Sequence, residues 1–251
     1  MLFRPMLALT AALMLSACAT RPPASDPDAM AEFQANNDPI EPANRVFYRI
    51  NDGLDTYIFA PVARGYRDVV PGGVRRPIHN VLANISSPAV FANDVLQTKP
   101  RRAGTTLMRF LINSTAGVGG LFDIASDLGY KQHETDFGVT MALWGVGDGP
   151  FLFLPLFGPS NPRDAAGFVA NFGLDPLTYA SFGGVKTLEY SRFGVGLVDS
   201  RERLLDPVEQ VKKAALDPYA TFRSLYRQNR SADIATTRAD EKATIPAWFN
   251  H

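Results

Sequence analysis

The sequence predicts an all-α fold built from many short amphipathic helices. Apolar residues recur at helical spacing through most of the chain, as Phe47, Ile50 and Leu54 do. Aspartate-proline pairs recur as well, and an aspartate cap followed by proline in the first turn is a typical helix start. These pairs are Asp38-Pro39, Asp175-Pro176, Asp206-Pro207 and Asp217-Pro218. Residues 145–162 are too rich in glycine and proline for a regular helix, so we expect an irregular, hairpin-like element within 144–160.

Length and charge limit the classes of function. The chain has 251 residues, which suits one large domain or two small ones. Lys plus Arg equals Asp plus Glu at 25 each, so the formal net charge is zero and nucleic acid is not expected as a partner. Three histidines and one cysteine leave little material for a metal site, and we expect neither a metal nor a cofactor.

The first 17 residues have the features of a secretory signal. Arg4 supplies a positive start, Met6–Leu15 is an apolar run, and Ser16 and Ala17 are small residues before a cleavage point. The apolar run is too short to span a bilayer. The sole cysteine, Cys18, comes next, and this arrangement resembles the bacterial lipobox, in which the cysteine is acylated. We therefore expect lipid attachment at Cys18; the alternative is an incidental cysteine.

The chain divides into four parts. Residues 1–17 form the signal, 18–37 a lipidated flexible tether, 38–230 one helical domain, and 231–251 a polar C-terminal tail. Ala19, which follows the acylated position, fits outer-membrane sorting better than inner-membrane retention. No second apolar stretch reaches about 18 residues, so no transmembrane helix is expected, although helices lying in one leaflet fit the sequence.

The helices of the domain follow from their start and stop signals. The first begins with Asp38 as N-cap and Pro39 at the first helical position, and the chain turns at Pro61. The next spans 74–85, and a separate helix restarts at Ser87-Pro88. Four more helices are expected from Pro100 to Gly117, from Ala165 to Phe172, from Val185 to Arg203, and after Pro218.

The segment between Asp136 and Asp164 is the most unusual part of the chain. Gly145, Gly147 and Gly149 alternate with other residues, and the apolar run 151–157 follows them. Because glycine tolerates both signs of φ, these three glycines are a candidate flexible or gating element. Two interpretations stay open: an irregular loop and strand in an ordinary core, or a non-helical element that meets an apolar ligand or a membrane.

The residues of a known catalytic arrangement are missing. The chain has no G-x-S-x-G motif, and His133-Glu134 is not followed by the second histidine of a zinc motif. The glycine run is neither a dinucleotide fingerprint nor a phosphate-binding loop. We therefore expect no catalytic residues and no enzyme, with a lipase whose triad is dispersed along the sequence as the alternative.

Several short motifs occur together along the domain. They are Gly145-Val146-Gly147-x-Gly149-Pro150, Leu154-Pro155, Arg163-Asp164, Asn44-Arg45 with Phe47, Tyr48 and Asn51, Tyr66-Arg67-Asp68-Val69-Val70-Pro71, Arg109-Phe110-Leu111-x-Asn113, and Asp217-Pro218-Tyr219. In combination, over residues 38–230, they resemble the signature of the MlaA (also called VacJ) family of outer-membrane lipoproteins.

The resemblance implies a fold and a function. It implies a ring of amphipathic helices in the inner leaflet of the outer membrane of a Gram-negative bacterium, with a conduit through the ring. It implies extraction of mislocalised phospholipid from the outer leaflet and transfer to a periplasmic lipid carrier protein, without covalent chemistry. It also implies association with a trimeric porin.

A conduit for phospholipid needs polar groups for the headgroup as well as apolar surface for the tails. The candidate polar residues are Asn44, Arg45, Asp136, Asn161, Arg163 and Asp164. For each of them the alternative is a role in bracing the fold. Two other functions stay open: a lipid-anchored periplasmic hydrolase, and a structural lipoprotein that binds a porin.

Overall fold

The computed structural model describes residues 37–239. The expected signal at 1–17, the lipid attachment at Cys18 and tether residues 19–36 lie outside the described residues, as does 240–251. The described part is mostly helical with one two-stranded sheet, so the expected all-α class with one irregular hairpin is confirmed.

The elements follow one another with short connections. The α-helices are α3 (Glu41–Leu54), α4 (Ala60–Val69), α5 (Gly72–Leu96), α6 (Pro100–Thr115), α7 (Ile124–Asp127), α8 (Phe137–Leu143), α9 (Pro162–Gly173), α10 (Val185–Arg203), α11 (Leu205–Ala214) and α12 (Pro218–Ala239). A π-helical turn, η1 (Asp55–Phe59), joins α3 to α4, and a 3-10 turn, η2 (Pro176–Tyr179), follows α9. The strands are β1 (Leu152–Leu154) and β2 (Gly158–Ser160), paired antiparallel.

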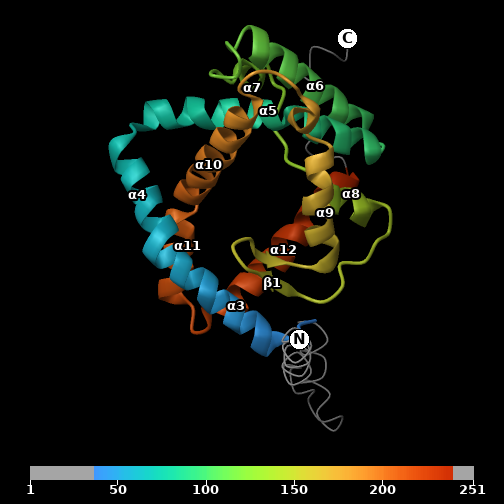
Figure 1. The fold of residues 1–251 in the computed structure, drawn as a ribbon. Helices are drawn as coiled ribbons and strands as arrows, with labels where there is room; N and C mark the ends of the chain where they lie inside the picture. The colour runs from blue at the N-terminus through green and yellow to red at the C-terminus, as the bar shows by residue number, and fades with distance from the viewer. Residues whose placement is uncertain (1–36, 240–251) are drawn as a thin grey trace, which may run out of the picture.

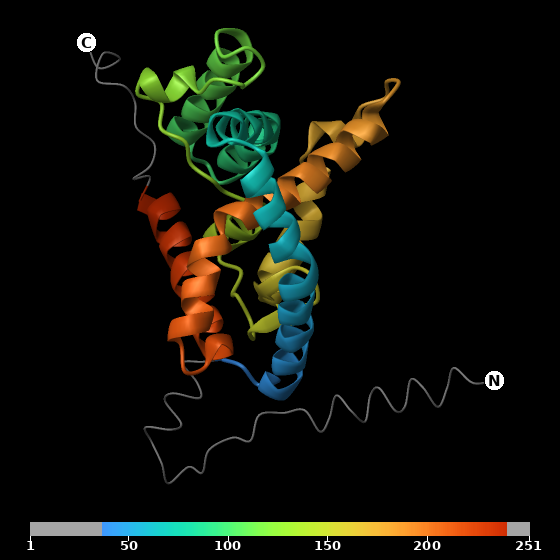
Figure 2. The same cartoon turned by 90° about the vertical axis from the view of Figure 1, so that its left-hand side faces the viewer.

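The helices are arranged around a ring (Figure 1). α3 and α4 form one side, α5 crosses the top, α9 runs along the other side, and α12 with the hairpin closes the lower part. Figure 2 shows this ring edge-on. The N-terminal half of α10 and the turn before it project on one side of the ring, whereas α11 and α12 lie on the opposite side.

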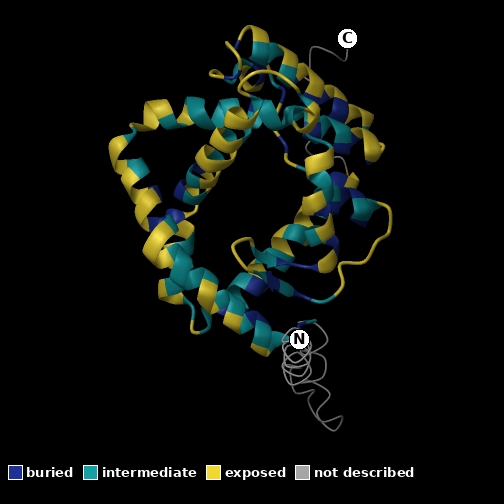
Figure 3. Ribbon diagram, in the orientation of Figure 1, coloured by how far each residue is buried: buried dark blue, intermediate teal, exposed yellow. Residues whose placement is uncertain are grey.

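Polar side chains occupy much of the interior. Among the described residues, Arg102, Asn93 and Asp94 are at most 1% exposed. The apolar clusters are small: Ala60 with Ala63 and Leu205, and Phe151 with Phe153 and Tyr219. Large apolar side chains lie instead on the surface, and exposed residues occur on both the inner and the outer side of the ring (Figure 3). This distribution is the reverse of that in an ordinary soluble core.

Two asparagine side chains hold the hairpin against α3. The Nδ2 of Asn44 donates to the carbonyl of Phe151 (3.0 Å), and its Oδ1 accepts from the N–H of Phe153 (2.9 Å). Asn51, two turns further along α3, makes the same kind of paired contact with the end of β1 and the hairpin turn, at 2.7 and 2.6 Å. Because buried backbone groups need partners, these amides replace a third strand along the edge of β1.

The first long helices are more continuous than expected. The predicted turn at Pro61 is wrong: η1 carries the helix from α3 into α4, and Pro61 lies in the first turn of α4, where its missing N–H is tolerated. The predicted restart at Ser87-Pro88 is also wrong, because α5 runs through Pro88. Beside this proline, the hydroxyls of Ser86 and Ser87 donate to carbonyls one turn earlier in the helix, at 3.0 and 3.1 Å.

Two of the four expected aspartate caps are confirmed. The carboxylates of Asp175 and Asp217 accept from N–H groups at the starts of η2 and α12. Asp38 and Asp206 are not caps: Asp38 is buried before α3, and Asp206 lies inside α11 and pairs with Arg67 on α4. Both carboxylates meet arginines instead, which shows that tertiary ion pairs override the local signal.

The boundary of the C-terminal tail also needs correction. The expected polar tail at 231–251 begins too early, because α12 continues without a break to Ala239. The reason is tertiary contact: Thr237 in the last turns is buried, and the Nζ of Lys99 donates to the carbonyl of Arg238 at 2.6 Å.

Replacing Asn44 with alanine should destabilise the protein. The substitution leaves the backbone carbonyl of Phe151 and the N–H of Phe153 without their side-chain partner, at about 1–3 kcal/mol for each buried group. We expect a loss of roughly 2–4 kcal/mol in unfolding free energy, measured by denaturant titration in detergent micelles. Asn80→Ala is the control, because Asn80 makes one exposed contact of 3.3 Å and should change little. Equal effects of the two substitutions would contradict the prediction.

Candidate functional site

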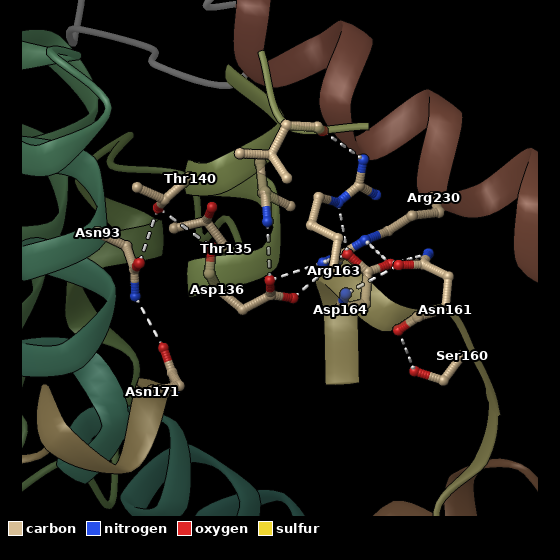
Figure 4. A network of polar contacts seen from close by, with 12 residues as sticks. Asn93, Thr135, Asp136, Thr140, Ser160, Asn161, Arg163, Asp164, Asn171 and Arg230 are labelled. Atoms are coloured by element: carbon tan, nitrogen blue, oxygen red, sulfur yellow. Dashed lines mark hydrogen bonds and ion pairs between the residues drawn. The ribbon is translucent and has the colours of Figure 1, made fainter. Parts of the chain in front are cut away.

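Four of the six candidate polar residues meet beside the glycine-rich segment. Asp136 and Asn161 are the N-caps of α8 and α9, each accepting a hydrogen bond from the backbone three residues later. Arg163 and Asp164 lie in the first turn of α9. Together with Tyr226 and Arg230 of α12, these four residues form what we term the Asp164 cluster. Figure 4 labels all of them except Tyr226. The cluster joins the starts of two helices to α12, the last helix among the described residues.

Arg230 connects two carboxylates at once. Its Nη1 and Nη2 donate to the two oxygens of Asp136, both at 2.7 Å. Its Nε and Nη2 donate to the two oxygens of Asp164, both at 2.9 Å. Asp164 also accepts from the hydroxyl of Tyr226 (2.5 Å) and the Nδ2 of Asn161 (2.7 Å). Such paired guanidinium–carboxylate contacts are among the strong hydrogen bonds of proteins.

These contacts shift the acidity of the buried groups. Burial by itself raises the pKa of Asp164, but the hydrogen bonds from Arg230, Arg163 and Tyr226 outweigh it and lower the pKa to about 2. Burial raises the pKa of Tyr226, and its hydrogen bond to Asp164 raises it further. Asp164 therefore stays ionised and Tyr226 stays protonated at neutral pH.

The other two candidates, Asn44 and Arg45, lie in a second cluster on α3. Arg45 donates to Asp217 at 2.6 Å and to Glu41 at 2.8 Å. Asn44 donates to the buried carboxylate of Asp38 at 2.8 Å. The structure thus brings the six candidates together in two groups, and every one of them has partners within the protein.

Sequence reasoning missed the residues of α12 that complete both clusters. Asp38 accepts from Arg223 at 2.7 Å and from the hydroxyl of Tyr219. Tyr219, Arg223, Tyr226 and Arg230 are spaced by four, three and four residues, so they lie on one face of α12. This stripe of alternating tyrosine and arginine is the signal that would have found them.

A further network lies behind the Asp164 cluster. Thr140 of α8 donates to Asn93 of α5 at 2.8 Å, and Asn93 donates to Asn171 of α9 at 2.9 Å (Figure 4). Three helices are therefore connected by polar side chains that are buried or nearly so. The result is a polar link between α5, α8 and α9.

The three glycines of that segment differ from one another. Gly145 and Gly149 have φ of +93° and +74°, values that favour glycine, whereas Gly147 is not among the residues with positive φ. A Cβ on Gly149 would lie 3.2 Å from Pro162, while one on Gly147 would meet open space. Two of the three glycines are thus required by the backbone conformation.

The arrangement favours bracing and binding over bond-breaking chemistry. The hydroxyl of Ser160, beside the cluster, contacts the carbonyl of Asn161 at 3.4 Å and the hydroxyl of Tyr226, and neither contact resembles the pairing of a nucleophile with a base. Within residues 37–239 no three His, Cys, Asp or Glu side chains gather in a way that would hold a metal ion. No helix in the described range has the length and apolar character to cross a membrane.

Comparison with known proteins gives consistent relatives. The model of a family described as MlaA lipoprotein matches residues 36–233. The chain is 36% identical over 203 residues to the intermembrane phospholipid transport system lipoprotein MlaA of Escherichia coli (strain K12), covering 78% of this chain and 77% of that protein. It is 31% identical over 245 residues to the protein of the same name from Haemophilus influenzae, covering 95% and 94%. An uncharacterised protein of Rickettsia bellii is 36% identical over 198 residues, covering 78% and 76%.

A solved structure is similar as well. It comes from work on the structural basis for maintenance of bacterial outer membrane lipid asymmetry. The TM-score is 0.69 at 32% sequence identity, and the match covers 78% of this chain and 98% of that chain.

The depressed pKa of Asp164 predicts a loss of stability in acid. A carboxyl whose pKa is lower in the folded than in the unfolded state stabilises the fold above its unfolded pKa, near 3.9. This contribution, about 2 kcal/mol, is lost as pH falls through the folded pKa of about 2. We expect Asp164→Asn to have a flatter stability curve than the wild type between pH 5 and 2, measured by denaturant unfolding in micelles. Parallel curves would count against this assignment.

Proposed function

Because the chain belongs to the MlaA lipoprotein family, we propose that it is an outer-membrane lipoprotein that removes mislocalised phospholipid from the outer leaflet and passes it to a periplasmic carrier protein. Relatives that share 31–36% of their residues with it are named for intermembrane phospholipid transport rather than for an enzymatic activity. The proposed role is physical transfer, which maintains the lipid asymmetry of the outer membrane.

The observation that carries this proposal is the reversed distribution of polar and apolar side chains. Tyr57, Tyr190 and Phe193 are 83%, 73% and 61% exposed, while Asn44 and Asp94 are 1% and 0% exposed. Exposed aromatic surface on this scale is unfavourable in water and marks contact with lipid or protein. A bilayer would cover the outside of the ring, and the polar clusters would hold the ring together where no large apolar core exists.

The two sides of the ring differ in a way that suits one leaflet. On one side, α9, η2 and the turn before α10 expose Val169, Phe172, Tyr179 and Phe182. On the other side, α11 and α12 expose mainly polar residues, such as Glu209. We propose that the aromatic side faces the hydrocarbon and that the α11–α12 side faces the periplasm. Because no described helix is fit to cross a bilayer, the ring would lie within the inner leaflet.

The remaining expectations complete the proposal. Cys18 would carry the lipid anchor, and residues 19–36 would tether it to the ring. The ring would enclose the conduit for phospholipid, and a trimeric porin would position it in the membrane. Arg163 would face the headgroup, because one donor of its guanidinium has no partner among the described residues. The other five candidates would brace the wall of the ring: Asn44, Arg45, Asp136, Asn161 and Asp164.

Deletion of the gene tests the transport role against both alternatives. We expect more phospholipid in the outer leaflet of deleted cells, measured by surface labelling, and sensitivity to detergent with a chelator. Purified protein should release no fatty acid from phospholipid. Fatty-acid release that a single serine substitution abolishes would establish the hydrolase instead. Unchanged asymmetry on deletion would leave only a structural role beside the porin.

Two glycine variants test whether the glycine-rich segment acts as a gate: Gly149→Ala and, as its control, Gly147→Ala. Gly149→Ala forces an L-residue to a positive φ beside Pro162, a strain on the order of 1–3 kcal/mol. We expect defective lipid asymmetry in cells that carry this variant, at normal abundance by immunoblot. Gly147→Ala meets open space without positive φ and should keep normal asymmetry. Normal asymmetry with both variants at wild-type abundance would exclude a gate at Gly149.

A further inference from the structure

We propose that the pocket beside the glycine-rich segment binds the headgroup of a phospholipid that combines a phosphate with a primary amine. The inference rests on the proposed function and specifies its substrate class. The pocket lies where residues 148–151, the start of α9 and α12 meet, and its cavity volume is about 80 Å³. These elements belong to the right and lower wall of the ring (Figure 1).

Arg163 supplies an unfilled donor to this pocket. Its side chain is 5% exposed, and its Nε donates to Asp164 at 2.9 Å. Its Nη1 makes only a long contact of 3.5 Å with the carbonyl of Val146, and its Nη2 has no partner among the described residues. A buried guanidinium with open donor positions is costly unless an acceptor fills them. Phosphate oxygens have the charge and geometry that a guanidinium binds best.

Asp148 supplies the opposite charge at the same pocket. It lines the pocket, is exposed, and has neither an ion pair nor a hydrogen bond with the described residues. The other acids close to the pocket, Asp136 and Asp164, are already occupied by Arg230. Asp148 is therefore the carboxylate that remains available for a cation.

The pairing of one free guanidinium edge with one free carboxylate selects the ligand. Arg227 and Arg230 also line the pocket, but both already have partners, so Arg163 and Asp148 are the charged groups left for a ligand. A simple anion would gain the contact with Arg163 but would leave Asp148 without a cation. A zwitterionic headgroup satisfies both, with its phosphate on Arg163 and its amine on Asp148. A primary ammonium donates hydrogen bonds to a carboxylate, whereas a trimethylammonium has no N–H to donate. The site should therefore prefer phosphoethanolamine headgroups over choline and glycerol headgroups.

The test is a titration of the purified full chain in detergent by calorimetry. The probes are dihexanoyl phosphatidylethanolamine, the matching phosphatidylcholine and phosphatidylglycerol, and tail-free glycerophosphoethanolamine. We expect the ethanolamine lipid to bind on the order of tenfold more tightly than the other two lipids. Asp148→Asn should remove this preference, and Arg163→Gln should weaken binding of all three lipids. Asp127→Asn, an exposed aspartate on α7, is the matched control and should bind as the wild type does.

Two results would overturn the inference: a wild type without headgroup preference, or a preference that survives Asp148→Asn. Equal affinity for the tail-free compound would overturn the lipid assignment in favour of a soluble phosphate ester. If Arg163→Gln does not fold, as judged by circular dichroism, Asp148→Asn decides alone because its side chain is exposed. If one of these contrary results is obtained while Asp148→Asn still restores lipid asymmetry in deleted cells, only the headgroup site is rejected. The proposed transport function then stands.

Discussion

The contact of Arg230 with Asp136 and Asp164 is the interaction on which the ring depends. The one positive guanidinium lies at hydrogen-bond distance from two negative carboxylates, and it holds the starts of α8 and α9 against α12. Arg223 does the same for the start of the described chain through Asp38, just before α3. α12 therefore connects segments from both ends of the domain, through these ion pairs and through the small aromatic cluster around Tyr219.

This choice of interaction suits the position in a membrane leaflet that we propose for the ring. In lipid, apolar side chains gain little by packing on one another, because hydrocarbon surrounds them in any case. Hydrogen-bonded ion pairs keep their directionality there, and removing one partner of a buried pair typically costs about 3–5 kcal/mol. The Asp164 cluster and the contacts of Asp38 thus close the ring together with the small aromatic cluster around Tyr219.

Local patterns in the sequence predicted the helical class, the hairpin and several helix starts, since each depends on residues near one another in the chain. They failed where distant residues compete for the same group. Asp38 resembles a helix cap until Arg223, 185 positions later, takes its carboxylate. The continuous α5 was missed because Ser87-Pro88 has the local pattern of a helix start, whereas the structure carries one helix through it. The candidate residues Asp136 and Asp164 were found by composition, but their shared partner Arg230 lies on another helix.

These contacts join residues that are far apart in the sequence, and this separation affects the order in which the protein folds. Tyr219 meets Asp38 across 181 positions, and Asn37 donates to the carbonyl of Gly149 across 112. Contacts between residues so far apart form late, because the entropy of closing the intervening loop must be overcome first. During synthesis α3 is made long before α12, so the carboxylate of Asp38 waits for Tyr219 and Arg223. The ring can therefore close only after nearly all of the described chain has been made.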